Sequence, residues 1–174
     1  YLEQERWDTT DQLMVSWPGS DYYYALDNFS WGYCTFEGFP DRVLDEADRF
    51  LNTQVHTPSQ QTIEGYCFDE DRDVVWLEGT SQMAIAYLKA GNGARANSIL
   101  HEVAKTRIAF STNGTVSIPY ATNQGTGYGG GMLWSGVDTQ PATAASCWFV
   151  MACHEFDPMQ LNYGKGIPDS FRFW

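Results

Sequence analysis

Apolar residues recur at helical spacing in several stretches of the chain, and two of these stretches are apolar on nearly every side. The first lies between Asp73 and Gly91, where Asp73 is expected to cap the helix and Gly91 to end it. The second runs over residues 142–154 and follows Pro141. Helices that are apolar all round are typically buried, so both are predicted to lie inside the protein.

Two further stretches, residues 40–51 and 94–110, have apolar residues on one side and polar or charged residues on the other. They predict amphipathic helices at the edge of a core. A short helix is expected over 11–17, closed by a Pro-Gly turn. The aromatic stretch 21–36 has the β-propensity of a strand, but a buried helix interrupted near Gly32 is favoured.

The remaining segments have the composition of loops. Residues 52–65 are polar, residues 111–139 combine many glycines with aromatic rings, and the chain after Phe156 is irregular. Buried and amphipathic helices therefore alternate, as they would in two concentric helical layers. The predicted fold class is all-α, a partial (α/α) toroid of helical hairpins, with residues 1–174 as a single domain.

Length and composition indicate a packed globular protein. The chain has 174 residues, of which 43% are hydrophobic and 16% aromatic, and a chain of this length can bury one sizeable core. The formal net charge is -12, which argues against nucleic acid as a partner because no basic patch is available to neutralise phosphates. The sequence has no apolar run long enough to cross a bilayer, so no membrane span is expected.

The four cysteines leave the disulfide state open. Cys147 and Cys153 are predicted on different faces of one helix, about 9 Å apart along its axis, and cannot bond to each other. A disulfide between Cys34 and Cys67 is possible, with the other two cysteines as small buried hydrophobes.

Two sequons, Asn28-Phe-Ser and Asn113-Gly-Thr, are typical of a secreted or cell-surface protein. The chain begins at Tyr1, without Met or a signal peptide, as a mature or trimmed product would. The expected location is therefore outside the cytoplasm.

Three segments carry a resemblance to a known family. They are Asp71-Arg-Asp-Val-Val-Trp-Leu-Glu-Gly-Thr-Ser-Gln-Met-Ala-Ile-Ala-Tyr-Leu-Lys-Ala-Gly91, Val116-Ser-Ile-Pro-Tyr-Ala-Thr122 and Ala142-Thr-Ala-Ala-Ser-Cys-Trp-Phe-Val-Met-Ala-Cys153. In order and spacing they resemble the six-hairpin glycosidase-like proteins, which include glycoside hydrolases and polysaccharide lyases. The resemblance implies an (α/α)6 toroid, of which this chain would be the C-terminal portion. The rest of a longer chain or other subunits would complete the ring.

The pair Glu78-Gly79 resembles the segment that carries the general acid in some toroid endoglucanases. Glycoside hydrolysis needs a protonated carboxyl group at the leaving oxygen and a carboxylate that activates water or attacks directly. Glu78 is predicted as the acid, and Asp71 or Asp73 of the preceding acidic turn as the base. The alternative is structural: Asp73 caps the helix, and Glu78 pairs with Arg72.

Aromatic side chains could stack on the flat apolar faces of sugar rings. The candidates for substrate binding are Trp76, Tyr120, Tyr128 and Trp134. Asp138 could hydrogen-bond a sugar hydroxyl, or it could cap the helix that follows.

No cofactor and no metal are expected. Asp69, Asp71 and Asp73 alternate as at the start of a calcium loop, but the glycine and the terminal glutamate of such a loop are missing. The predicted function is that of an extracellular, glycoside hydrolase-like protein that binds oligosaccharide or polysaccharide. The alternative is a non-catalytic glycan-binding or surface assembly module on the same scaffold. A polysaccharide lyase with Tyr120 as base is less favoured, because the acidic chain disfavours an anionic substrate.

Overall fold

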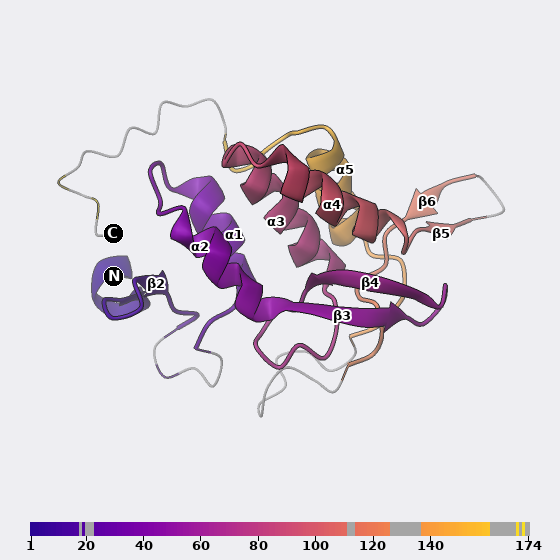
Figure 1. The fold of residues 1–174 in the computed structure, drawn as a ribbon, viewed down its shortest axis with the longest axis horizontal. Helices are drawn as coiled ribbons and strands as arrows, with labels where there is room; N and C mark the ends of the chain where they lie inside the picture. The colour runs from indigo at the N-terminus through magenta and orange to yellow at the C-terminus, as the bar shows by residue number, and fades with distance from the viewer. Residues whose placement is uncertain are drawn as a thin grey trace.

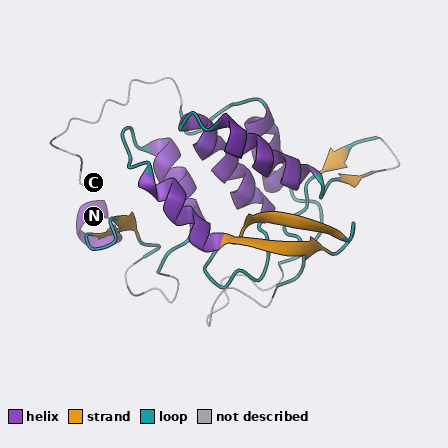
Figure 2. Cartoon of the chain, in the orientation of Figure 1, coloured by secondary structure: helices purple, strands orange, loops and turns teal. Residues whose placement is uncertain are grey.

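The computed structural model describes residues 1–17, 19, 23–110, 114–125, 137–160, 170 and 172, in which helices mix with short strands (Figures 1 and 2). The α-helices of these residues are α1 (Leu26–Thr35), α2 (Arg42–Glu46), α3 (Leu77–Lys89), α4 (Gly93–Ala104) and α5 (Thr143–Cys153). A π-helical turn η1 (Leu2–Arg6) and a 3₁₀ turn η2 (Ala47–Phe50) complete the helical elements of the described residues. The strands are β1 (Trp7–Asp8), β2 (Leu13–Met14), β3 (Leu51–His56), β4 (Gln61–Tyr66), β5 (Ile108–Ala109) and β6 (Val116–Ser117).

The prediction of an all-α toroid is wrong, because consecutive strands pair into three antiparallel two-stranded sheets. The largest is the β3–β4 hairpin, which occupies the segment expected to be a polar loop (Figure 2). Its register runs from the pair Leu51 and Tyr66 to the pair His56 and Gln61. Most outward positions of this hairpin are polar, but Val55 is 49% exposed, so the sequence of the hairpin shows little of the apolar alternation that marks a half-buried strand.

Helix α3 is the central element. It contacts α1, α4 and α5, and β4 packs against α3 and α4 (Figure 1). The prediction of a buried helix before Gly91 is confirmed, since every residue from Gly79 to Tyr87 is buried. The predicted cap is wrong: the N-cap position is held by Trp76, without a side-chain bond, and Asp73 lies outside the helix.

The start of α3 is fixed by neighbouring main chain instead of by a cap. The amide of Trp76 donates to the carbonyl of Tyr66 at 2.8 Å, and the amide of Leu77 donates to the carbonyl of Tyr120 at 3.1 Å. The hydroxyl of Thr80 donates to the carbonyl of Trp76 at 2.7 Å and accepts from the amide of Tyr66 at 3.0 Å. These bonds take up amide groups that a helix start otherwise leaves without partners.

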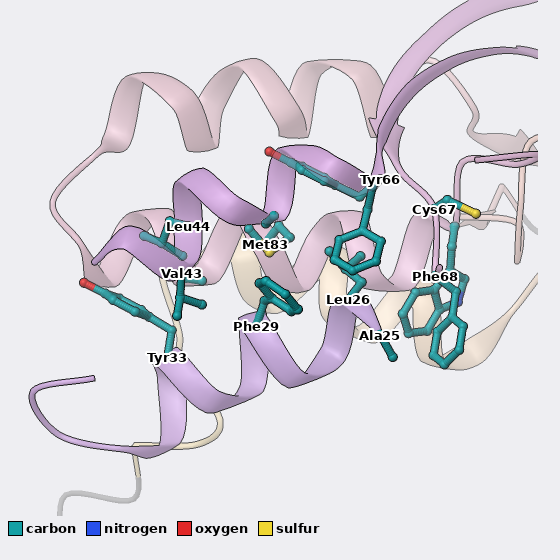
Figure 3. Close-up of a cluster of buried hydrophobic side chains, with 14 of the residues drawn as sticks. Ala25, Leu26, Phe29, Tyr33, Val43, Leu44, Tyr66, Cys67, Phe68 and Met83 are labelled. Carbon is teal, nitrogen blue, oxygen red and sulfur yellow. The ribbon is translucent and has the colours of Figure 1, made fainter. Parts of the chain in front are cut away.

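The main hydrophobic core lies between α1, α2, β4 and α3. Figure 3 shows its side chains gathered between the helices, and the labelled members are Ala25, Leu26, Phe29, Tyr33, Val43, Leu44, Tyr66, Cys67, Phe68 and Met83. The rings of Phe29 and Phe50 meet edge to face at 5.2 Å, a favourable geometry for aromatic pairs. A smaller cluster contains Ile63, Val75, Leu77, Val103, Ile118 and Ala145.

The other predicted helices are confirmed in part. Residues 40–51 form α2 and η2, and α1 continues without interruption through Gly32. The predicted helix over 94–110 ends at Ala104, where the chain turns into β5, and the predicted helix over 11–17 is a turn followed by β2.

Helix α5 forms where it was predicted, but it is only partly buried. Ala145 and Ala152 face the interior, whereas Val150 is 53% exposed. No helix within the described ranges is long and apolar enough to cross a membrane.

Candidate functional site

Glu78 lies in the first turn of α3, where side chains of α1 and α5 meet it. It is half-buried. The side-chain amide of Gln82 donates to Glu78 Oε1 at 3.3 Å, and Ser30 Oγ of α1 donates to Gln82 Oε1 at 3.3 Å. From α5, the indole of Trp148 also hydrogen-bonds Glu78. Glu78 is thus held by a chain of polar contacts between three helices.

A second carboxyl group, that of Asp27 in the first turn of α1, acts on Glu78. Burial raises the pKa of Glu78, the Trp148 bond lowers it, and the charge of Asp27 raises it further. Burial also raises the pKa of Asp27, but two backbone amides and the charge of Arg6 oppose the rise. Backbone amides and the charge of Arg6 favour the Asp27 anion, and the charge of this anion raises the pKa of Glu78.

Two tryptophans flank this pair. Trp31, one turn after Asp27 on α1, stacks with Trp148 at 6.4 Å between ring centroids and 26° between planes. Trp31 is 41% exposed, so part of its ring is open to solvent. Glu78 is thus bonded to one member of an aromatic pair whose other member, Trp31, is partly open to solvent.

Trp76, a predicted sugar platform, faces the core in this structure. It is 4% exposed, and its ring meets Phe68 edge to face at 5.4 Å. The other side of the ring covers Gly79: a Cβ at that position would stand 2.8 Å from Leu26 and closer still to two carbons of the indole. The glycine after Glu78 thus makes room for a buried tryptophan.

Asp71 and Asp73, the predicted bases, converge on Cys67. The Cys67 sulfur lies 3.6 Å from Asp71 Oδ1 and 3.8 Å from Asp73 Oδ1. The groups that act on Glu78 are instead Gln82, Trp148 and Asp27. The role of Asp71 or Asp73 as base stays a prediction, and the ion pairs of the described residues do not join Glu78 to Arg72.

Asp69 belongs to the same turn and is deeply buried. Burial raises its pKa to about 7, and the neighbouring Asp71 adds to the rise. Burial also raises the pKa of the Cys67 thiol to about 12. Asp69 was singled out in the sequence only as part of an alternating acidic pattern, and the convergence on Cys67 was not foreseen.

The remaining candidates have structural contacts. Asp138 Oδ1 accepts from the amide of Gln140 at 2.8 Å, which makes a turn before α5 and not a helix cap. Tyr120 is partly buried against the core, and its carbonyl supports the start of α3. Tyr128 and Trp134 lie outside the described residues.

The cysteines are free thiols, so the disulfide considered between Cys34 and Cys67 is not formed. Both are buried, but Cys34 lies near Lys89 and Asp157 at the other end of α1. Cys67 is therefore available for other chemistry.

Comparison with known proteins finds no matching family model, no matching curated sequence and no matching solved structure. The resemblance to six-hairpin glycosidase-like proteins stays a prediction.

Proposed function

We propose that this chain is a carbohydrate-active protein of the glycoside hydrolase type, acting outside the cytoplasm, with Glu78 as its general acid. The observation that carries the proposal is the pair of carboxyl groups at the first turns of α1 and α3, with Asp27 favouring the protonated form of Glu78. Carboxyl groups whose environments separate their ionisation are typical of acid and base pairs in hydrolases.

In this reaction Glu78 donates its proton to the glycosidic oxygen as the bond to the sugar breaks. Asp27 supplies the carboxylate that activates water or attacks the sugar carbon. Burial and the charge of Asp27 both raise the pKa of Glu78, which favours the protonated form that a general acid requires. Trp31 offers an exposed ring face for a sugar next to the pair.

The test is hydrolysis of a panel of polysaccharides and aryl glycosides by the chain and by three variants. Glu78→Gln is expected to lower kcat on polysaccharides by about 10²–10⁴-fold, the usual contribution of general acid catalysis. It should cost much less on aryl glycosides with acidic phenol leaving groups, because such a phenolate departs without a proton. Asp27→Asn should lose activity on both substrate classes.

Glu37→Gln is the matched control, since Glu37 is exposed and is not among the groups that shift the pKa of Glu78 or Asp27. It should leave all rates unchanged. Equal activity of Glu78→Gln and the parent chain on every glycan would remove Glu78 from the mechanism.

A second function, that of a non-catalytic glycan-binding or surface assembly module, is favoured by one observation. Helix α5 has no charged residue and yet exposes apolar side chains, among them Val150 at 53%. Uncharged exposed faces of this kind mark interaction surfaces. This function would replace hydrolysis if the parent chain bound glycans without cleaving them.

A further inference from the structure

The loop between β4 and α3 gathers three side chains, Cys67, Asp71 and Asp73, whose possible ligand atoms all lie within 4.8 Å of one another. Asp69 lies beside them, with its Oδ1 3.8 Å from the Cys67 sulfur. The sulfur lies 3.8, 3.6 and 3.8 Å from Oδ1 of the three aspartates in chain order. A thiol has one proton and is a weak donor, so it cannot satisfy three carboxylates. The sulfur points away from the apolar side chains of α1 (Figure 3).

Asp69 provides a second observation, independent of the clustering. It is 3% exposed, and its Oδ2 is buried without a hydrogen-bond partner among the described residues. Its Oδ1 is directed into the cluster, where it faces the Cys67 sulfur and accepts from the amide of Asp71 at 3.4 Å. Buried carboxylate oxygens are otherwise paired, because an unpaired one is costly. Asp69 thus brings to the cluster a buried oxygen that a cation or a retained proton would neutralise.

The charges around the cluster lead to the same conclusion. Glu70, the acidic residue at the outer side of the loop, pairs with Arg49 at 3.3 Å. The charged groups that act on Asp69 are Asp71 and Asp73, and both are negative. A bound cation would reverse this repulsion.

The donor set and its dimensions select the class of metal. In a tetrahedral zinc site, with bonds of about 2.3 Å to sulfur and about 2.0–2.2 Å to oxygen, the sulfur and each oxygen are about 3.5–3.7 Å apart. The distance of 3.6 Å from the Cys67 sulfur to Asp71 Oδ1 falls within this range, and the two distances of 3.8 Å to Asp69 Oδ1 and Asp73 Oδ1 lie about 0.1 Å above it. Calcium instead requires six to eight oxygen ligands and does not select thiolate.

We propose that Cys67, Asp71 and Asp73, with the neighbouring Asp69 as a fourth carboxylate, form a binding site for a borderline-soft divalent cation of the Zn²⁺ class. The thiol gives up its proton to solvent when the metal binds. Asp71 is exposed and Asp73 half-exposed, which leaves an entry path from solvent. The site is separate from the hydrolase proposal and does not depend on it.

The loop is rigidly placed for this role. The amide of Cys67 donates to the carbonyl of Phe50 at 2.9 Å, and the Asn52 side chain donates to the carbonyl of Val74 at 3.0 Å. Gly125 lies directly behind Asp73, since a Cβ there would stand 2.8 Å from Asp73 Oδ2. Fixed main chain on both sides keeps the ligands together before the metal arrives.

The test is titration of the metal-free chain with Co²⁺, followed by competition with Zn²⁺ and separate titrations with Ca²⁺. Co²⁺ reports on zinc sites because its tetrahedral complexes absorb strongly in the visible and thiolate ligation adds a charge-transfer band in the near ultraviolet. We expect one Co²⁺ per chain, both spectral features, displacement by Zn²⁺ and a rise in Tm with Zn²⁺. Absence of the thiolate band would overturn the proposal.

Variants locate the site. Cys67→Ser should remove the charge-transfer band, whereas the exposed Cys147→Ser should keep it. Asp71→Asn should weaken Co²⁺ binding by at least about tenfold, because even indirect supporting groups cost that much. Asp45→Asn, at another exposed acidic position, should not.

Asp71 is exposed, so Asp71→Asn keeps the test decisive if Cys67→Ser fails to fold. Equal Co²⁺ affinity of Asp71→Asn and the parent chain would overturn the proposal. So would a thiolate band that is lost in Cys147→Ser instead of Cys67→Ser. Tight Ca²⁺ binding that is unchanged by Cys67→Ser, without Zn²⁺ competition, would show an oxygen-only site and likewise overturn it.

Discussion

Replacement of Gly79 by alanine tests how α3 is packed, because helix propensity and packing predict opposite signs. In a helix interior, alanine is favoured over glycine by about 1 kcal/mol. In this structure the new Cβ would stand 2.8 Å from Leu26 Cδ2 and nearer still to the Trp76 ring. Contacts under 3.0 Å essentially never occur for real Cβ atoms, so the ring must move.

The ring has little room to move. Trp76 is 4% exposed and is held against Phe68. Overpacking a core lowers the free energy of unfolding by about 1–3 kcal/mol. Because the Trp76 ring is confined, the loss is expected to be about 3 kcal/mol. After the helix-propensity gain is subtracted, Gly79→Ala should destabilise the protein by about 2 kcal/mol, which lowers Tm by about 4–8 °C in a chain of this size.

The assay is thermal unfolding followed by circular dichroism, with Gly93→Ala as the matched control. Gly93 begins α4 and a Cβ there would meet nothing within 4 Å, so this variant should be as stable as the parent or more stable. In the background of Trp76→Leu, Gly79→Ala should cost clearly less, because the obstructing ring is gone. A Gly79→Ala protein with unchanged or raised Tm would refute this account of the packing.

Two further predictions concern the same region. Glu78→Gln should raise Tm at pH 7. In the folded state the pKa of Glu78 lies above its usual value of 4.5, so the ionisation of Glu78 lowers the free energy of unfolding as pH rises through the folded-state pKa. Glutamine does not ionise and avoids this cost. The gain should vanish below about pH 4, where the carboxyl is protonated in both states, and the exposed Glu37→Gln should show no such pattern in pH-dependent melting. Thr80→Val should cost about 1–3 kcal/mol in urea unfolding, because the amide of Tyr66 loses its buried acceptor. The exposed Thr53→Val should be near neutral, and equal midpoints for the two would contradict the bond.

Those parts of the fold that depend on local pattern could be predicted from the sequence. The buried helix before Gly91 and the helix after Pro141 are both present, because their apolar residues continue over several turns. The β3–β4 hairpin was missed because its core contacts fall on few positions, chiefly Ile63 and Tyr66. A strand that is polar on its outer face has the same composition as a loop.

The candidate site was predicted only in part, since it depends on contacts between distant segments. Glu78 was named from its own segment, but Asp27 was missed because only the packing of α1 against α3 brings the two together. A local signal existed: Asp27 and Trp31 are one turn apart and share a helix face. Gly79, three residues after Trp76, likewise signalled a ring packed against the helix and not a free sugar platform.

The two proposed sites have one physical feature in common. At each, burial raises the pKa of one carboxyl group, Glu78 or Asp69, and the charge of a neighbouring aspartate raises it further, which costs stability. Elsewhere in the described chain acidic side chains are readily paired, as with Arg49 beside Glu46 and Glu70. Local departures of this kind from a consistent design are expected at functional sites. The segment from Cys67 to Glu78 contains both carboxyl groups with a raised pKa, Asp69 and Glu78. Hydrogen bonds at the start of α3 hold the end of this segment in place. We infer that this segment carries the function of the chain.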